Sequence, residues 1–526
     1  MKFIKKGLSL LEEEKYQLII LVIIFAVFLF TRFAFLDRVP AGMHVDEYGA
    51  AYDSRCLADY GVDRYLTKMP PYLKNYGGGQ SVLYAYTAAL FVKIFGFSVT
   101  GFRAVAGFYA TIAFVCLYFL GRLVFDKKKY ALIPPFLMTV MPVYFMAERW
   151  GLDCNLFLSL IIISFFFLAK AGYERKKVWF VMSGVSLGIT LYTYAITYLV
   201  LPVFLVLSLV YLLIIKKIKL SEIVCFAIPL VFIGLPIFLE QLVNSGRIPE
   251  FSTGFMDFKR MDGYRGGEFS LANISSNIPG LWSILSHDTL NYSANAAFGT
   301  LYYISIPFML MGIGICVKRS VDSVKQKKFD MCPIFLMYFI VSLFVGLITE
   351  KININRVNGI YSVLLIFTAL GIAFVWEKAE FSPAVIIPAY LVYFLLFGIF
   401  YFCGSYNESV STENTEGLFQ KRDMGEAVKF LKEKYNDEKK VWVIANDGVE
   451  WRIIIAAMTG TSPYEYAEEG YVENNYEIGV PEELDISGDC VYVIGKDIHH
   501  ITDYLATVGF TVDDVNYGKY SVVYKE

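Results

Sequence analysis

An acidic pair, Asp46 and Glu47, follows the first long apolar segment of the chain, residues 18–36. That segment is long enough to cross a bilayer, so the two carboxylates lie just beyond a membrane span. Charged residues make up only 18% of the 526 positions, and acidic groups close to a span are a reason to suspect a functional site. A carboxylate held near a hydroxyl group can remove its proton during a transfer reaction. The pair is therefore a candidate catalytic site, with His44 beside it as a supporting residue.

Two further loops carry charges at the ends of apolar segments. The loop 148–153 contains Arg149 and Asp153, and Arg356 is a lone arginine at the start of a later segment. If these loops face the same side as Asp46, carboxylates and arginines converge at one membrane face. Such a site suits a reaction in which a base removes a proton while a cation stabilises a departing phosphate.

Simpler interpretations of these residues stay open at this point. Asp46 and Glu47 would also stabilise the first turn of a helix, because acidic side chains favour a helix N-terminus. Arg149 and Asp153 have the spacing of a local ion pair on one helix face, which contributes little to stability.

The expected topology depends on four basic clusters, at residues 122–129, 175–177, 216–219 and 318–328. Under the positive-inside rule these clusters are cytoplasmic. All four reach the cytoplasm if the apolar run 81–97 lies along the outer surface, and all four face outward if that run spans the membrane. The run is short and is interrupted by Lys93, so we favour an interfacial helix, with a short span as the alternative.

The chain is then a polytopic α-helical membrane protein with surface helices on its outer side. Eleven spans are expected, at 18–36, 101–122, 130–147, 154–171, 178–193, 195–214, 222–241, 298–317, 331–348, 355–376 and 383–403. The N-terminus is cytoplasmic and the C-terminus is outside. The two long loops, 37–100 and 242–297, both face outward, which places the working surface there.

The charge balance changes near residue 404. From Gly404 to the C-terminus the chain carries 24 acidic and 11 basic residues, whereas the rest of the chain is basic. This asymmetry predicts two domains, a membrane domain at 1–403 and an acidic soluble domain at 404–526. Within the latter, strands are expected at 441–445, 490–494 and 521–524, and helices at 424–435 and 498–508, which indicates a small α/β fold.

Several motifs occur in a fixed order along the membrane part: His44–Tyr48, Gly79–Tyr84, Ile94–Ser98, Arg103, Arg149–Asp153, Gly299–Tyr303 and Asn355–Gly359. Their order and spacing resemble the GT-C glycosyltransferases, and within these the protein mannosyltransferase and aminoarabinose transferase branch. The resemblance covers about residues 15–375. It implies that a sugar is moved, with inversion, from a polyprenyl-phosphate carrier to a protein, glycan or lipid acceptor at the outer membrane face.

The resemblance also implies roles for particular residues. Asp46 matches the catalytic base of the family and Asp153 matches its second acidic position, and we include the adjacent Glu47 among the catalytic candidates. Family members often hold the donor phosphate with a lysine where this chain has Gln80. That difference shifts the expected phosphate contact to Arg356 and Arg149. Arg103 is expected to support the site.

The resemblance implies no required cofactor, although some members of the wider class use a divalent metal at this carboxylate site. The expected partners are the lipid-linked donor, membrane lipid and an acceptor, and no nucleic-acid signature is present. The eight cysteines have no spacing typical of a zinc site or a disulfide framework. Two alternatives remain: a transporter or flippase of lipid-linked sugars, and a non-catalytic assembly protein whose acidic tail binds partners.

Overall fold

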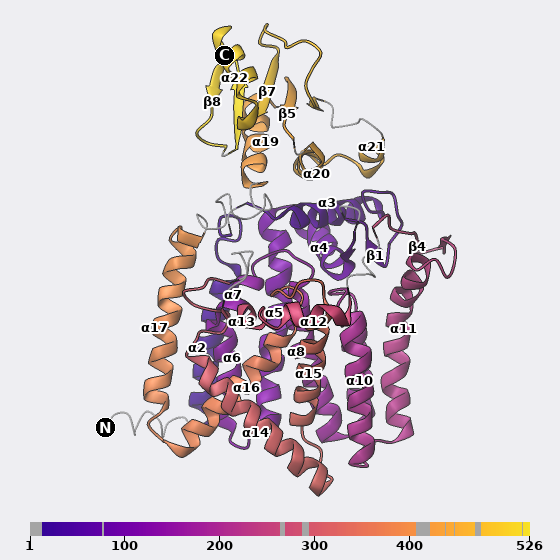
Figure 1. The fold of residues 1–526 in the computed structure, drawn as a ribbon, viewed down its shortest axis with the longest axis vertical. Coiled ribbons are helices and arrows are strands. Elements are labelled where there is room, and N and C mark those ends of the chain that lie inside the picture. Colours follow the sequence, from indigo (N-terminus) through magenta and orange to yellow (C-terminus); the bar gives the residue numbers. More distant parts are fainter. Residues whose placement is uncertain are drawn as a thin grey trace.

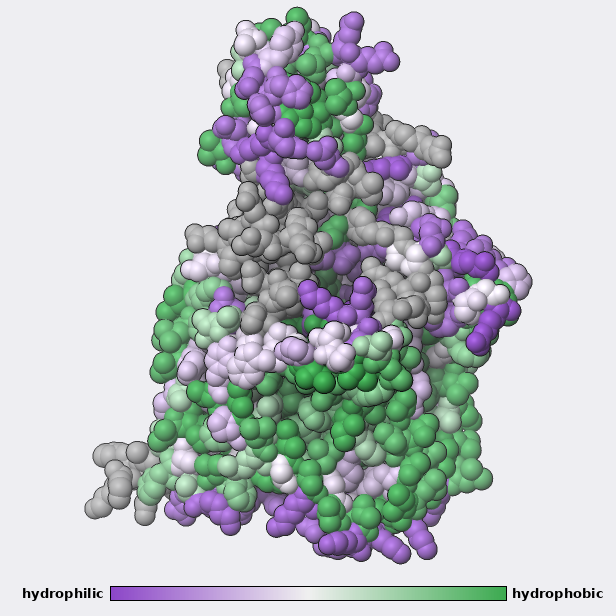
Figure 2. All heavy atoms as spheres, viewed as in Figure 1, coloured by the Kyte–Doolittle hydropathy of each residue, from purple (hydrophilic) through white to green (hydrophobic). Residues whose placement is uncertain are grey.

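The computed structural model describes residues 13–40, 42–75, 78–263, 269–286, 294–406, 421–436, 438–446, 448–468, 475–517 and 519–525. Figure 1 shows a bundle of long helices with a small α/β unit at one end. Hydrophobic side chains surround the bundle, while hydrophilic side chains gather at its far end and over the small unit (Figure 2). This distribution is that of a multi-pass membrane protein.

Within the described residues, eight helices are long and apolar enough to cross a bilayer. They are α2 (Glu14–Phe33), α5 (Val99–Val124), α8 (Asn155–Glu174), α10 (Thr197–Ile214), α11 (Leu220–Asn244), α14 (Ser305–Gln326), α16 (Ile360–Lys378) and α17 (Pro383–Phe402). Two shorter apolar helices, α9 (Lys177–Thr190) and α15 (Cys332–Ile348), correspond to the fifth and ninth expected spans.

The third expected span, 130–147, is not one continuous helix. It consists of the 3₁₀ segment η1 (Lys128–Leu132), α6 (Ile133–Val140) and α7 (Pro142–Ala147). Met141 is extended, with φ −72° and ψ 135°, and Pro142 begins the next helix. Proline has no amide hydrogen to donate to the preceding turn, so α6 ends here. The expected spans therefore appear as ten continuous helices and one interrupted segment.

Ion pairs at one end of the bundle bring the start of α2 beside the end of α5. Lys128 Nζ lies 2.5 Å from Glu14 Oε1, and Lys127 Nζ lies 3.6 Å from Glu377 Oε1 at the end of α16. The chain thus crosses the bundle out and back between Glu14 and Lys128. This arrangement agrees with the interpretation of 81–97 as a segment that does not span the membrane.

The residues between α2 and α5 form surface helices at the other end of the bundle. Helix α3 (Val45–Tyr60) lies across that end in Figure 1, with α4 (Val82–Phe95) beneath it. His44 caps α3: its Nδ1 accepts the amide hydrogen of Asp46 (3.0 Å), while the Glu47 carboxylate accepts the amide hydrogen of His44 (2.9 Å). Gly61, in the left-handed region at φ 72°, ends the helix.

Short elements complete this end of the bundle. They are the hairpins β1 (Tyr72–Leu73) with β2 (Gln80–Ser81) and β3 (Phe251–Ser252) with β4 (Asp257–Phe258), then η2 (Leu271–Asn273), α12 (Ile274–Asn277) and α13 (Leu281–Ser286). Helix α16 is the most enclosed of the eight long spans, since 83% of the residues in its apolar stretch are buried inside the protein. Residues at its N-terminal end can therefore be held firmly.

The C-terminal unit contains a five-stranded sheet in the order β6-β5-β7-β9-β8. Its elements are α19 (Lys421–Tyr435), β5 (Lys440–Ile444), α20 (Gly448–Thr459), α21 (Pro463–Ala467), β6 (Tyr476–Ile478), β7 (Cys490–Gly495), η4 (Lys496–Ile498), α22 (His499–Thr507), β8 (Thr511–Asp513) and β9 (Tyr520–Tyr524). Strand β5 is parallel to both β6 and β7, whereas β9 is antiparallel to β7 and β8. The three expected strands and two expected helices are all present.

The C-terminal unit rests on the surface helix that begins with the acidic pair. Helix α20 packs against α3. The Tyr52 hydroxyl of α3 donates a hydrogen bond to the Thr461 carbonyl (3.0 Å), and its ring lies 5.1 Å from that of Tyr466. The soluble unit therefore helps to fix the position of α3.

The orientation of the bundle leads to a labelling prediction. In a Cys403→Ser background, which removes an exposed native thiol, we expect a cysteine at Ser487 to react with a membrane-impermeant reagent in intact cells. A cysteine at Lys128 should stay unlabelled until the cells are opened, because the lysine-rich end is expected to be cytoplasmic. Labelling at position 128 alone would reverse the expected orientation.

Candidate active site

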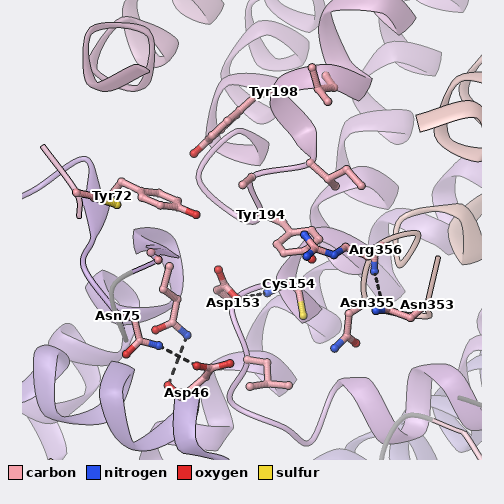
Figure 3. A pocket seen from close by; sticks show the side chains of 18 of the residues that line it. Asp46, Tyr72, Asn75, Asp153, Cys154, Tyr194, Tyr198, Asn353, Asn355 and Arg356 are labelled. Carbon is pink, nitrogen blue, oxygen red and sulfur yellow. Dashed lines mark hydrogen bonds between the residues drawn. The ribbon is translucent and has the colours of Figure 1, made fainter. Parts of the chain in front are cut away.

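A cavity of about 410 Å³ lies at the end of the bundle that carries α3. Its walls come from the start of α3, the β1–β2 hairpin, the loop before α8, the start of α10 and the loop before α16 (Figure 3). Of the residues predicted from sequence, the cavity is lined by His44, Asp46, Gln80, Asp153 and Arg356. Three distant parts of the sequence therefore meet in one place.

The two members of the acidic pair have opposite environments. The Asp46 side chain lines the cavity and is 43% exposed, whereas the neighbouring Glu47 is completely buried outside it. Adjacent residues on a helix point about 100° apart, so only one of them can face the cavity. Asp46 is thus the carboxylate that a substrate can reach.

Glu47 is committed to structural contacts. Its carboxylate accepts hydrogen bonds from Arg103 Nε (2.9 Å) and Nη2 (2.8 Å), from the amide of Gly151 (2.6 Å) and from the amide of His44. The helix-capping interpretation therefore describes Glu47. This placement corrects our expectation that Glu47 belongs to the catalytic group, because neither carboxylate oxygen faces the cavity.

Arg103 and Arg149 hold the loop that links α2 to α3. Arg103 Nη1 donates to the carbonyls of Leu36 (2.9 Å) and Pro40 (2.7 Å), and Arg149 donates to three carbonyls of the same region. The Arg149 acceptors are Thr31 (2.6 Å), Ala34 (2.7 Å) and Val39 (2.6 Å). Arg103 thus holds the loop that precedes α3, and a supporting role for it in the reaction stays a prediction. Arg149 is corrected from a phosphate ligand to a structural residue, because its guanidinium is buried and already bonded to the backbone.

A chain of polar contacts orients Asp46. Asn75 Nδ2 donates to Asp46 Oδ1 (2.8 Å), while Asn75 Oδ1 accepts from Arg64 Nη2 (2.5 Å). Because Arg64 engages the amide oxygen, the amide NH₂ must point at the carboxylate. The buried Asp53 accepts the Arg64 amide hydrogen (3.0 Å), and burial raises the pKa of Asp53 to about 7 against the opposing effect of Arg64.

Asp153 faces the same cavity from the loop before α8. Its Oδ2 accepts the amide hydrogen of Ser81 (2.8 Å) and its Oδ1 accepts that of Cys154 (2.8 Å). Burial raises the pKa of Asp153 to about 7, the two amides lower it, and the nearby Asp46 raises it. Burial and the nearby Asp46 thus both favour the protonated form of Asp153 more than in an ordinary carboxyl group.

Gln80 and Arg356 reach the cavity from opposite walls. Gln80 Nε2 contacts the Asp46 carbonyl at 3.5 Å, and its amide oxygen is buried with no hydrogen-bond donor within the described ranges. The backbone amide of Arg356 donates to Asn353 Oδ1 (2.9 Å), which fixes the loop before α16. Figure 3 shows Arg356 across the cavity from Asp46. A cation and an exposed carboxylate thus face one space.

The sequence did not single out several residues of the lining. Tyr72, Asn75, Tyr194, Tyr198 and Gln241 all face the cavity, and the hydroxyls of Tyr72 and Tyr198 point into the same region in Figure 3. The run of glycines just before Gln80 was the available signal for Tyr72 and Asn75, because glycine permits close approach of a loop to a ligand. The tyrosines resembled the many aromatic residues of the spans.

Comparisons with solved structures reveal the same architecture. ArnT from Cupriavidus metallidurans matches in its apo state with a TM-score of 0.58 and 12% identity, over 95% of this chain and 97% of that chain. The same enzyme bound to undecaprenyl phosphate matches with a TM-score of 0.55 and 14% identity, over the same shares of the two chains. This chain has the GT-C fold.

Two other comparisons bear on the GT-C assignment. Residues 80–243 match the family model of dolichyl-phosphate-mannose-protein mannosyltransferases. The apo oligosaccharyltransferase of Archaeoglobus fulgidus matches with a TM-score of 0.50 and 13% identity, over 94% of this chain and 71% of that chain. No curated protein sequence matched the chain. The expected fold class, a GT-C bundle with a small C-terminal α/β unit, is confirmed.

Proposed function

We propose that this protein is an inverting glycosyltransferase that moves a sugar from a polyprenyl-phosphate carrier to an acceptor hydroxyl at the outer membrane face. The observation that carries this proposal is the cavity in which Asp46, an exposed carboxylate, and Arg356 line facing walls. The comparisons support it, since one matching structure holds undecaprenyl phosphate and the matching family acts on dolichyl-phosphate mannose.

The reaction divides between the two walls. Asp46 accepts the proton of the acceptor hydroxyl as the hydroxyl oxygen forms a bond to the anomeric carbon of the sugar. The bond between that carbon and the phosphate oxygen breaks, and the polyprenyl phosphate leaves with the bonding electrons. Attack from the side opposite the leaving group inverts the anomeric centre. General-base assistance of this kind contributes roughly 10²–10⁴-fold to the rate.

The departing phosphate is already charged, so it needs a cation more than a proton. The Arg356 guanidinium can donate two parallel hydrogen bonds to phosphate oxygens. Asn75 holds Asp46 in place, and the raised pKa of the buried Asp153 favours its neutral form, which would limit the negative charge facing the phosphate. That no cofactor is required remains a prediction, and no step above depends on a metal ion.

The function can be tested with purified protein and a panel of polyprenyl-phosphate sugars. We expect one donor to release polyprenyl phosphate in an acceptor-dependent manner. If the protein in reconstituted vesicles instead moves the intact lipid-linked sugar across the bilayer without cleaving it, the glycosyltransferase proposal is contradicted and the transporter alternative is favoured.

The phosphate contact leads to a further prediction. Arg356→Ala should weaken binding of undecaprenyl phosphate roughly 10–100-fold, because a hydrogen bond to a charged group contributes about 1.5–3 kcal/mol. Arg356→Lys should retain part of the affinity, since an ammonium group acts as a point charge. The matched control is Arg38→Ala, because that side chain is 77% exposed at the same end of the protein. Equal affinities for all three variants would move the phosphate site away from Arg356.

A further inference from the structure

A second cavity, of about 270 Å³, adjoins the first and shares Tyr72 and Met261 with it. Its other walls are the loop 63–74, the end of α11 and the segment 257–260 that contains the end of β4. Figure 1 places β4 beside the end of α11, and Figure 2 shows hydrophilic side chains gathered there, beyond the hydrophobic surface. A water-soluble group can therefore approach this cavity without entering the lipid.

The inner wall of the second cavity contains a buried carboxylate, that of Glu240. Glu240 of α11 is only 2% exposed, and its Oε1 accepts a hydrogen bond from Asn244 Nδ2 (2.8 Å). Asn244 in turn accepts the amide hydrogen of Met261 (2.8 Å), which ties this group to the shared wall. Glu240 Oε2 is buried and has no hydrogen-bond donor among the described residues. A buried carboxylate oxygen without a donor is costly, so it is suited to a ligand that supplies one.

A hydroxyl group in the first cavity has the same property. The Tyr198 hydroxyl is buried with no hydrogen-bond partner in the described part of the chain. Tyr198 lines the first cavity together with Tyr72, which also lines the second. Each of the two adjoining cavities thus contains a buried polar atom without a hydrogen-bond partner among the described residues.

The residues that line the second cavity indicate which chemical class of ligand it can bind. They combine donors such as Lys259 with acceptors such as Glu240 and with the rings of Tyr65 and Tyr72. Two of the charged groups already have opposite charges close by: Lys74 Nζ lies 2.5 Å from Asp262, and Asp257, which accepts the Lys68 amide hydrogen (2.8 Å), is stabilised by the charges of Lys259 and Lys68. Such a lining favours a neutral group that both donates and accepts hydrogen bonds, and hydroxyls do both.

A peptide, another acceptor class with suitable hydroxyls, fits this cavity less well. An extended peptide gains affinity by pairing its backbone with a free strand edge. The two hairpins beside the cavity, β1–β2 and β3–β4, have strands of only two residues each. The wall therefore provides side-chain contacts and very little backbone edge.

We propose that the second cavity binds the acceptor as a saccharide, with Glu240 Oε2 accepting a hydrogen bond from one of its hydroxyls. The saccharide then extends past Tyr72 and Met261, which the two cavities share, so that another of its hydroxyls reaches Asp46. This inference rests on the proposed function and specifies the acceptor class for it.

The test measures binding of two ligand classes to purified full-length protein. One probe set is fluorescent di- to tetrasaccharides of hexoses and N-acetylhexosamines, and the other is serine- and threonine-containing octapeptides. We expect saturable binding of at least one saccharide, weakened about 10-fold or more by Glu240→Gln, as for loss of a hydrogen bond to a charged group. Lys259→Met, at the exposed rim, should weaken it by a smaller factor. Glu377→Gln, the same change at the far end of the bundle, should have no effect.

Undecaprenyl phosphate binding, measured on the same samples, separates the possible failures. Unchanged affinity for this lipid shows that a variant is folded, so unchanged saccharide binding by Glu240→Gln would then overturn the inference. Binding of peptides but no saccharides would also overturn it. Failure of the wild-type protein to bind undecaprenyl phosphate contradicts instead the proposed function itself.

Discussion

Asp46→Asn is expected to lower sugar transfer by roughly 10²-fold or more while leaving folding and undecaprenyl phosphate binding intact. The amide keeps the shape of the carboxylate but cannot accept the acceptor's proton. Folding should survive because the side chain is 43% exposed and makes few contacts. The measurement is single-turnover transfer with a saturating donor, which separates chemistry from donor binding.

Two comparison variants make this result specific. Asn75→Ala should reduce transfer less than Asp46→Asn, since it removes only the hydrogen bond that orients Asp46 Oδ1. Asp53→Asn, on the same helix but outside the cavity, should reduce the chemical step less than Asn75→Ala does, since Asp53 reaches Asp46 only through Arg64 and Asn75. Near-normal transfer by Asp46→Asn would remove that residue from the reaction, and the transporter alternative would then become the better account.

Glu47→Gln is expected to cause the largest loss of stability, because it leaves the buried Arg103 guanidinium without a counter-charge. Removing one partner of a buried ion pair costs about 3–5 kcal/mol. Both side chains are completely buried, and their nitrogen and oxygen atoms lie 2.8 Å apart. Thermal unfolding of the purified protein should show a clear decrease for Glu47→Gln and almost none for Asp46→Asn.

A double variant distinguishes this structural role from a catalytic one. Glu47→Gln combined with Arg103→Met should be less destabilised than the sum of the two single changes, since neither charge remains unpaired. The fraction of Glu47→Gln that remains folded should still transfer sugar. A fully stable Glu47→Gln protein without activity would restore Glu47 to the catalytic group.

The fold was largely predictable because its signals are local or additive. Apolar segments marked the spans, and the basic clusters indicated that 81–97 does not cross, in agreement with the Glu14–Lys128 contact. The break at Pro142 escaped the hydropathy pattern, since both halves of that segment are apolar. Proline inside an apolar segment was the available signal.

The site was predictable only in part, because its details depend on side-chain direction. The sequence identified Asp46, Asp153 and Arg356, which the structure brings to one cavity. It could not reveal that the carboxylate of Glu47, at the third position of its helix, accepts a hydrogen bond from the amide of the N-cap residue His44. Nor could the four-residue spacing of Arg149 and Asp153 reveal that both lie outside a helix, since α7 ends at Ala147 and α8 begins only at Asn155.

Asn75 and Glu240 depended on contacts between distant parts of the chain. Asn75 is an ordinary loop residue until Arg64 and Asp46 are placed on either side of it. Glu240 appears from sequence to be a single acidic residue near the end of a span. Its buried oxygen indicates a binding site only once the structure places it in the same cavity as Tyr72 and Met261.

The guanidinium contacts to the loop between α2 and α3 have a consequence for biogenesis. The carbonyls of that loop leave the ribosome well before Arg103 and Arg149, whose side chains hold them in place. The loop therefore gains its shape only after α5 and α7 have entered the membrane beside α2. Because Asp46 directly follows the loop, a nascent chain with only its first span inserted has no organised reaction centre. We therefore expect such an intermediate to be inactive toward lipid-linked sugars in the bilayer.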